Sequence, residues 1–225
     1  MNKLVIPTLR NFLIGALLLG VLLFLPAGTF NYWQAWVFIA VFMVTISVFG
    51  LYFSIKDPEL MERRKKAGPG AEQSTLQKIV ATIALTSLFA VFVVCGLDHR
   101  FGWSHMPPVV SWVGDGLEVF SFIMFYWVFK ENSFGGSSIR VEENQKVIST
   151  GPYAIVRHPM YVGTIVMVIG IALGLGSWWA LLFLVIQMFV LPIRILDEER
   201  LLKKDLPGYT EYAQKVRYRL VPYLW

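Results

Sequence analysis

The sequence has little charge and almost no cysteine. Of its 225 residues only 16% are Asp, Glu, Lys or Arg, whereas ordinary globular chains carry about 25%. This composition excludes a disordered chain and a coiled coil, which both need many charged residues. The single cysteine, Cys95, excludes an internal disulfide and a metal site built from several cysteines.

The chain has instead long apolar runs. Hydrophobic residues make up 56% of it, and its mean hydropathy is +0.59. Four runs reach the roughly 20 residues that a helix needs to cross a ~30 Å hydrocarbon layer. These runs cover residues 11–30, 33–55, 79–97 and 109–129. We therefore predict an all-α, polytopic membrane helix bundle in which residues 1–130 form a scaffold of four spans.

A fifth apolar run, 161–195, is too long for one ordinary span. It contains Gly174-Leu175-Gly176-Ser177, where helix propensity is weak. We predict a helical hairpin whose two helices have about 16 to 18 residues each, or roughly 25 Å at the helical rise. This length barely spans a bilayer. The hairpin lies in a second region, 131–225, that ends in a polar C-terminal tail.

Positive charge is confined to alternate segments between the apolar runs. All of the 20 lysines and arginines except Arg100 lie before residue 11, in 56–78, in 130–160 or after residue 193. The positive-inside rule then predicts that both termini and both basic loops are cytoplasmic. The net charge of +5 thus indicates a multi-pass membrane protein rather than a nucleic-acid partner.

A basic run and a pair of histidines are interpreted without a catalytic or metal-binding role. The run Arg63-Arg64-Lys65-Lys66 is typical of juxtamembrane cations that set topology and contact anionic lipid headgroups. His99 and His105 share a short loop with Asp98, but two imidazoles without further ligands at matched spacing do not predict a metal site. We expect no metal.

The polar segment before the hairpin carries the first constellation of candidate site residues. Pro159 keeps His158 out of helical geometry and is suited to be the first helical residue. His158 is thereby expected at the cytoplasmic mouth of the hairpin, with Tyr153 facing the same mouth. The free N–H groups of a helix start attract an anionic group. The alternative is an ordinary interfacial loop in which Arg157 binds a lipid phosphate.

A second constellation lies on the last part of the hairpin. Arg194 and Glu198 are four residues apart and share a helical face, and Gln187 lies seven residues before Arg194 on the same stripe. Polar residues in an apolar run are expensive unless they face protein or a water-filled cavity. The alternative is a structural Arg194–Glu198 pair with the arginine reaching the interface, which leaves Gln187 unexplained. Both constellations together predict one pocket, open to cytosol and lipid, for a cationic cofactor and an anionic substrate group.

Several motifs, in this order, resemble the isoprenylcysteine carboxyl methyltransferase family of integral membrane enzymes. They read Gly151-Pro152-Tyr153, Arg157-His158-Pro159-Met160-Tyr161, Glu198-Glu199-Arg200-Leu201-Leu202 and Gly208-Tyr209-Thr210-Glu211-Tyr212. The resemblance covers about the last hundred residues. It implies S-adenosylmethionine bound in a cytosol-facing pocket that the C-terminal segment closes, and a lipophilic substrate that arrives from the bilayer.

The resemblance also implies roles for individual residues. Arg194 would hold the methyl-accepting carboxylate, with Gln187 beside it on the substrate side. Eukaryotic-type members have a histidine where this chain has Gln145, whose amide can still donate or accept a hydrogen bond. The other cofactor-lining residues would be Val147, Ile148, Tyr153, His158, Tyr161 and Glu198.

The implied reaction is carboxyl O-methylation of an isoprenylcysteine-like acceptor. A carboxylate is ionised at neutral pH and needs no general base, so alignment is the main catalytic task. A thiol or amine acceptor would make His158 the base. The alternatives are a phospholipid-amine or small-thiol methyltransferase, an NADPH-dependent sterol-type reductase with a similar Arg-x-Pro-x-Tyr hairpin, and a membrane protein without enzymatic activity.

Overall fold

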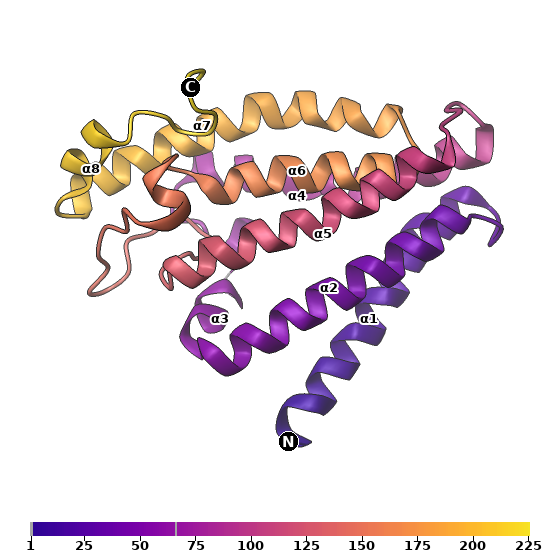
Figure 1. Cartoon of the computed structure of the whole chain (residues 1–225), viewed down its shortest axis with the longest axis horizontal. Coiled ribbons are helices and arrows are strands. Elements are labelled where there is room, and N and C mark those ends of the chain that lie inside the picture. The colour runs from indigo at the N-terminus through magenta and orange to yellow at the C-terminus, as the bar shows by residue number, and fades with distance from the viewer. Residues whose placement is uncertain (1, 66) are drawn as a thin grey trace.

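The computed structural model describes residues 2–65 and 67–225, and for residues 2–8 the backbone alone. Lys66 of the basic run lies outside the described residues. All regular structure in the described part is helical, which confirms the all-α prediction (Figure 1). Four long helices cover the four predicted spans. They are α1 (Asn2–Ala27), α2 (Trp33–Lys56), α4 (Thr75–Phe101) and α5 (Pro108–Glu131).

The predicted hairpin is present, but its second helix is longer than expected. The first helix, α6 (Pro159–Gly174), has 16 residues and ends at the predicted turn. The short η3 (Trp179–Leu181) then leads into α7 (Leu182–Asp205), which continues past residue 195. The residues that follow the apolar run are mainly Glu, Arg, Leu and Lys, which are strong helix formers. Five of the described helices, α7 included, are long and apolar enough to cross a membrane, whereas α6 is shorter.

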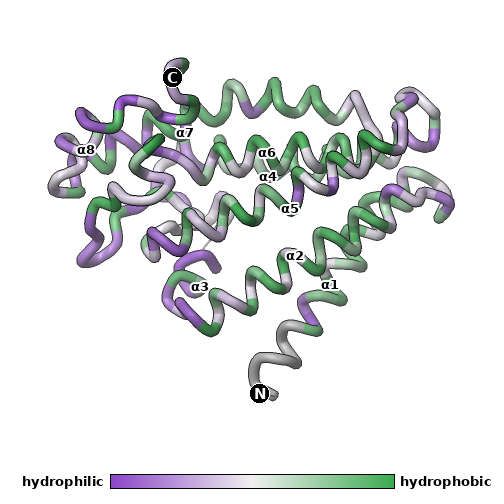
Figure 2. The backbone as a smooth tube through the Cα atoms, in the orientation of Figure 1, coloured by the Kyte–Doolittle hydropathy of each residue, from purple (hydrophilic) through white to green (hydrophobic). Residues whose placement is uncertain are grey.

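Short helices gather at one end of the bundle. They are α3 (Pro58–Lys65), η1 (Pro69–Ala71), η2 (Gly151–Ala154) and α8 (Tyr209–Lys215). Together with residues 132–150, which we call the polar loop, they form the hydrophilic end of the molecule, while apolar sequence follows the long helices (Figures 1 and 2). The basic segments before α4, after α5 and after α7 thus share this end. Its cytoplasmic orientation stays a prediction.

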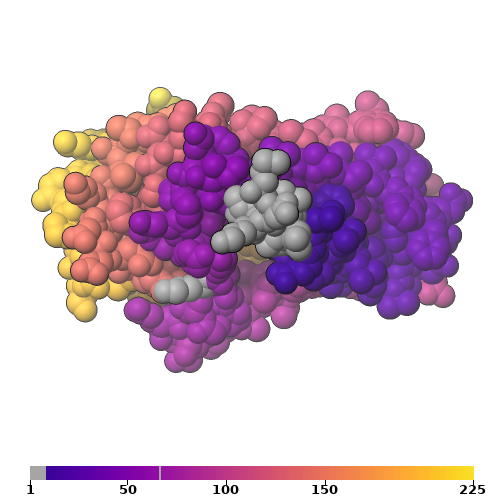
Figure 3. Space-filling model, turned by 90° about the horizontal axis from the view of Figure 1, so that it is seen from below, coloured from indigo at the N-terminus to yellow at the C-terminus, as the bar shows by residue number. Residues whose placement is uncertain are grey.

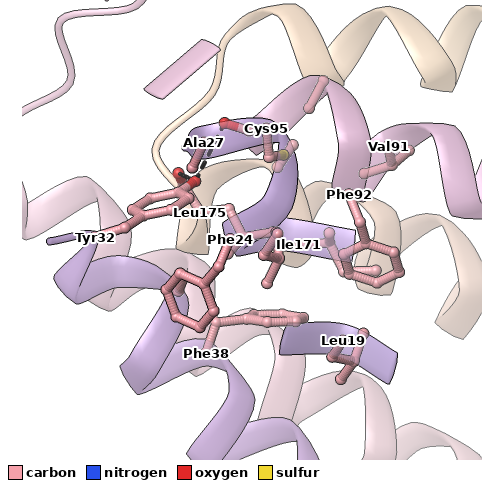
Figure 4. Packing of buried hydrophobic residues seen from close by; sticks show 14 of the residues in the cluster. Leu19, Phe24, Ala27, Tyr32, Phe38, Val91, Phe92, Cys95, Ile171 and Leu175 are labelled. Atoms are coloured by element: carbon pink, nitrogen blue, oxygen red, sulfur yellow. Dashed lines mark hydrogen bonds between the residues drawn. The ribbon is translucent and has the colours of Figure 1, made fainter. Parts of the chain in front are cut away.

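Buried side chains from α1, α2, α4 and α6 form the main hydrophobic core. Phe24, Phe38, Phe92 and Ile171 pack against one another near the middle of this cluster (Figure 4). At its edge the hydroxyl of Tyr32 donates a hydrogen bond to the backbone oxygen of Leu175, in the hairpin turn. The scaffold therefore holds the hairpin at the end opposite the polar loop.

Glycines bring α5 and α6 into close contact. A methyl group added to Gly114 on α5 would overlap the backbone of Gly174 on α6, and one added to Gly170 would lie 3.0 Å from the backbone oxygen of Gly114. Small residues allow such close packing of helices within a membrane. Because α5 fixes α6 along its length, the start of α6, with His158 before it, has a defined position at the polar end.

Candidate functional site

The polar loop is fastened to the scaffold by two arginines of α3. Arg63 Nη1 donates to the backbone oxygen of Ser133 over 2.8 Å, and Arg64 Nη1 donates to that of Gly135 over 3.1 Å. The Arg64 guanidinium also lies 4.3 Å from the centre of the Phe129 ring, and burial lowers the pKa of Arg64 to about 10. The interpretation as lipid-contacting cations therefore misses the role of these two residues. Seen from below, α3 and the polar loop form adjacent parts of one surface (Figure 3).

A cavity lies between the polar loop, η2, the start of α6, the polar half of α7 and α8. The structure brings into its lining all the residues that the sequence suggests for a cofactor. They are Gln145, Val147, Ile148, Tyr153, His158, Tyr161 and Glu198. Ile139, Leu202 and Leu206 add apolar surface to the same cavity. A ligand inside it would meet a carboxylate, an imidazole, phenol rings and aliphatic side chains.

His158 is buried and held on both sides. Its backbone N–H donates to the backbone oxygen of Arg219 over 2.9 Å, so the C-terminal segment is bound directly to the start of α6. Its ring Nε2 lies 3.3 Å from Glu199 Oε1, and its Nδ1 lies 3.9 Å from Glu198 Oε2. Two adjacent carboxylates of α7 therefore face opposite nitrogens of one imidazole.

Glu199 is the centre of a buried ionic cluster. Its carboxylate lies 3.1 Å from Arg157 Nε and 3.2 Å from Arg219 Nη2, in addition to His158. Arg157 is thus buried and paired within the protein, rather than directed at a lipid phosphate as the interfacial-loop alternative requires. Sequence reasoning singled out Glu198 and missed Glu199, although the motif contains both.

Arg194 lies beside the cavity and is linked to it through Tyr161. Its Nε donates to the Tyr161 hydroxyl over 3.1 Å, and that hydroxyl donates to Glu198 Oε2 over 2.8 Å. Its other nitrogens donate to Gln77 Oε1, to Glu72 Oε1 and to the backbone oxygen of Ser137. These bonds use four of the five N–H groups of the guanidinium.

Sequence reasoning missed two partners of Arg194 and included one residue that lies elsewhere. Glu72 lies just before α4 and Gln77 in its first turn, and both precede Arg194 by more than a hundred residues, so no local pattern links them. Gln187 is buried within α7 but is not among the residues that line the cavity. The stripe of Gln187, Arg194 and Glu198 therefore reaches the cavity only at its polar end.

Three tyrosines close the cavity on the side of α8. The Tyr153 hydroxyl accepts a hydrogen bond from Asn132 Nδ2 over 3.0 Å, and burial raises the pKa of Tyr153 to about 12. The Tyr212 hydroxyl donates to the backbone oxygen of Tyr153 over 2.8 Å. The Tyr209 hydroxyl is buried, and no described residue forms a hydrogen bond with it. It is a polar group that a ligand in this cavity could satisfy.

Among the residues that the structure describes, no group of three or more His, Cys, Asp or Glu side chains is arranged so that it could hold a metal ion. His99 lies at the end of the bundle opposite the cavity, where its Nε2 is 3.0 Å from the backbone oxygen of Asn31.

Residues 109–207, which supply most of the cavity, match the family model described as phospholipid methyltransferase. The chain is also 27% identical to the Delta(14)-sterol reductase TM7SF2 of Mus musculus over 94 residues, 40% of this chain and 22% of that protein. It is 30% identical to the nickel-cobalt-cadmium resistance protein NccN of Alcaligenes xylosoxydans xylosoxydans over 78 residues, 32% of this chain and 35% of that protein. The chain thus spans about a third or less of the length of these relatives.

The family match bears on the resemblance noted in the sequence. It confirms the likeness to membrane methyltransferases of the isoprenylcysteine carboxyl methyltransferase type. With five described helices long and apolar enough to cross a membrane, it supports an integral membrane methyltransferase. The match does not specify the acceptor.

Proposed function

We propose that this chain is an S-adenosylmethionine-dependent methyltransferase that modifies a lipophilic acceptor at the cytoplasmic face of a membrane. The observation that carries the proposal is the cavity at the polar end where Tyr153, His158, Tyr161 and Glu198 meet. These side chains come from η2, from α6 and the residue that precedes it, and from α7. The cavity belongs largely to the segment that matches the methyltransferase family model.

The chemistry of the cavity fits this cofactor. Glu198 offers a carboxylate for the amino or hydroxyl groups of the cofactor, and phenol faces suit a sulfonium cation. The buried Tyr209 hydroxyl needs a partner, because a polar group buried without a hydrogen bond costs about 1–3 kcal/mol. Val147, Ile148 and Leu206 offer apolar surface for a planar base. When bound, the cofactor supplies an electrophilic methyl group.

For the acceptor we favour a carboxylate of the isoprenylcysteine type, oriented by Arg194. The guanidinium lies one hydrogen bond away from Tyr161 in the cavity wall. Because Gln77, Glu72 and Ser137 already accept from it, its one remaining N–H would orient a carboxylate without neutralising it. An ionised carboxylate needs no base, so alignment at near-attack distance is the task left to the protein. In this scheme Gln187 contributes to the path from the lipid.

The second candidate is methylation of a phospholipid amine, which the description of the matched family favours. An ammonium group must lose a proton before it attacks a methyl group. His158 is placed for this step, because Glu199 holds its Nε2 at 3.3 Å and leaves Nδ1 on the side of Glu198. A positioned histidine is the side chain that most often accepts a proton in general-base catalysis.

A third candidate, an NADPH-dependent reductase, rests on the similarity to the sterol reductase. Its cofactor carries a 2′-phosphate that needs cations. Arg140 and Lys146 line the cavity, but Arg140 is already 3.4 Å from Glu142. We rank this candidate below both methyltransferases.

Calorimetric titration of the detergent-solubilised protein separates these candidates. We expect S-adenosylmethionine and S-adenosylhomocysteine to bind, NADPH not to bind, and Glu198→Gln to weaken both adenosyl ligands. Glu143→Gln, an exposed carboxylate of the polar loop, is the matched control and should bind as the parent does. Binding of NADPH alone would favour the reductase, and binding of none of the three ligands would refute the enzyme assignment.

The acceptor is tested with methyl-labelled cofactor. We expect label in a prenylated cysteine with a free carboxylate, and a large loss of this activity in Arg194→Ala. Label in phosphatidylethanolamine vesicles instead, with loss in His158→Gln, would select the amine reaction.

A further inference from the structure

Glu72 lies outside the segment that matches the methyltransferase family model, yet it touches the wall of the cavity. It stands between η1 and α4, and only 4% of its surface is exposed. One carboxylate oxygen accepts from Arg194 Nη2 over 2.8 Å, and the other accepts from the backbone N–H of Ile139 over 3.0 Å. Ile139 lines the cavity. A buried carboxylate of the scaffold therefore joins Arg194 to the polar loop.

This contact begins a line of hydrogen bonds that ends inside the cavity. Glu72 accepts from Arg194, Arg194 donates to Tyr161, and Tyr161 donates to Glu198. Arg194 is additionally held by Gln77. The orientation of the Tyr161 hydroxyl in the cavity thus depends on a guanidinium that residues of α4 and the preceding loop fix in place.

The charge of Glu72 matters as much as its geometry. Arg194 is 14% exposed in its side chain, and the Glu72 side chain is 1% exposed, so solvent screens neither charge well. A lone guanidinium at this position would raise the electrostatic potential of the cavity and oppose a sulfonium cation. Paired with Glu72, it forms a neutral unit that keeps its hydrogen bonds.

We propose that Glu72 is a positioning residue that fixes Arg194 and cancels its charge, so that the cavity favours the cationic methyl donor over the neutral thioether left after transfer. This inference rests on the proposed function, since it assumes an S-adenosylmethionine site. If Glu72 acts in this way, the scaffold region, residues 1–130, contributes to the selectivity of the cavity for the methyl donor over the product.

The test compares the affinities of S-adenosylmethionine and S-adenosylhomocysteine by calorimetry. Glu72→Gln keeps the shape of the side chain and removes its charge. Because a buried unit charge acts on a nearby cation through a medium of low effective dielectric constant, we expect the ratio of donor to product affinity to fall roughly tenfold. Glu72→Asp keeps the charge and should keep most of the ratio. Glu59→Gln, in a surface ion pair on α3, should leave the ratio unchanged.

A double-mutant cycle that removes each charge in turn keeps the test valid if Glu72→Gln is unstable. Arg194→Gln should raise the ratio, and the double variant Glu72→Gln with Arg194→Gln should return it to about the parental value. The double variant leaves no buried charge without its partner, which is the costly outcome of a single substitution, so it is expected to fold.

The outcomes separate this inference from the function on which it rests. Equal weakening of both ligands in Glu72→Gln, or an unchanged ratio across the cycle, would show a purely structural role and overturn the inference. A parent protein that binds neither ligand would overturn the proposed function and the inference with it.

Discussion

The two ends of the bundle are both polar, but their polar atoms are used differently. At the end opposite the polar loop, Asp98 accepts hydrogen bonds from the backbone N–H and hydroxyl of Ser104 and from the hydroxyl of Ser177. Its carboxylate is fully engaged by the protein. At the other end Glu198 and Tyr209 line a cavity, and the buried Tyr209 hydroxyl has no hydrogen-bond partner among the described residues.

This difference separates a structural cluster from a ligand site. At the end that holds Asp98, His99 is likewise engaged by the protein, because its ring stacks on Tyr32 with 3.9 Å between the ring centres. Polar residues are common at both ends of a membrane bundle, and their number alone says little about function. Buried polar atoms without a partner among the described residues occur at both ends, because Gln34 Oε1 and Ser111 Oγ beside the hairpin turn also lack one. What distinguishes the cavity end is that Tyr209, whose hydroxyl is unpartnered, lines the same cavity as Glu198. Substitutions at the Asp98 end should change only the free energy of unfolding, whereas substitutions at the cavity end should also change the affinity for S-adenosylmethionine.

The largest effect is expected from Glu199→Ala at the cavity end. Removal of this carboxylate leaves Arg157 buried without its ionic partner and releases Arg219 and His158. Breaking a buried ion pair in this way costs about 3–5 kcal/mol. We expect a loss of this size in the free energy of unfolding, measured in mixed detergent micelles, together with loss of S-adenosylmethionine binding.

Glu211→Ala is the matched control, because Glu211 is exposed on α8 and surface substitutions usually change stability by no more than about 0.5 kcal/mol. A loss below about 1 kcal/mol in Glu199→Ala would mean that the ionic cluster does not hold the C-terminal segment in place.

A smaller effect is expected from Asp98→Asn at the opposite end. The amide oxygen can still accept from the backbone N–H of Ser104, but the amide NH2 then takes the place of the oxygen that accepts from both serine hydroxyls. Leaving such a buried group unpaired costs about 1–3 kcal/mol. The affinity for S-adenosylmethionine should remain that of the parent, because the cavity lies at the other end of α4, α6 and α7. The two measurements are unfolding in micelles and calorimetric titration.

His105→Gln supplies the control for this end, since His105 is exposed in the same turn. It should change neither quantity. If Asp98→Asn weakened cofactor binding as strongly as it weakened stability, the two ends would be coupled and the proposed division of roles would fail.

The sequence predicts the long apolar helices well, because a helix that crosses a bilayer needs an apolar run of a length that hydropathy reveals. Apolar runs locate α1, α2, α4 and α5, and Gly174 to Ser177 locates the hairpin turn. The end of α7 is missed for a physical reason: hydropathy marks where the lipid ends, whereas helix propensity decides where the helix ends. The short helices α3 and α8 are missed because neither contains an apolar run from which a helix could be predicted.

The candidate site is predictable where its residues are close in sequence and not where they are distant. Tyr153, His158 and Tyr161 stand within nine positions, and Pro159 sets the local geometry that brings them to one mouth. Glu72 contacts Arg194 across 122 positions, and the loop around it resembles any solvated polar segment. A buried carboxylate of this kind becomes visible only when the packing of α4 on α7 is known.

The smallest effect is expected from Tyr209→Phe, which removes the unpartnered hydroxyl of the cavity. Because this hydroxyl forms no hydrogen bond with a described residue, its removal should not lower the free energy of unfolding of the ligand-free protein. If the hydroxyl bonds the cofactor, the variant should lose about 0.5–1.5 kcal/mol of binding free energy, or roughly two- to twelvefold in affinity.

The matched control for Tyr209→Phe is Tyr212→Phe, one turn further along α8. The Tyr212 hydroxyl already donates to the backbone oxygen of Tyr153, so its loss should lower the free energy of unfolding by about 1 kcal/mol and affect cofactor binding only through that backbone. Loss of the Tyr209 hydroxyl would then lower the affinity for the cofactor, whereas loss of the Tyr212 hydroxyl would lower the free energy of unfolding. If Tyr209→Phe were destabilised and bound the cofactor normally, its hydroxyl would be satisfied by the protein or by water, and the cavity would lose its clearest unfilled hydrogen-bonding position.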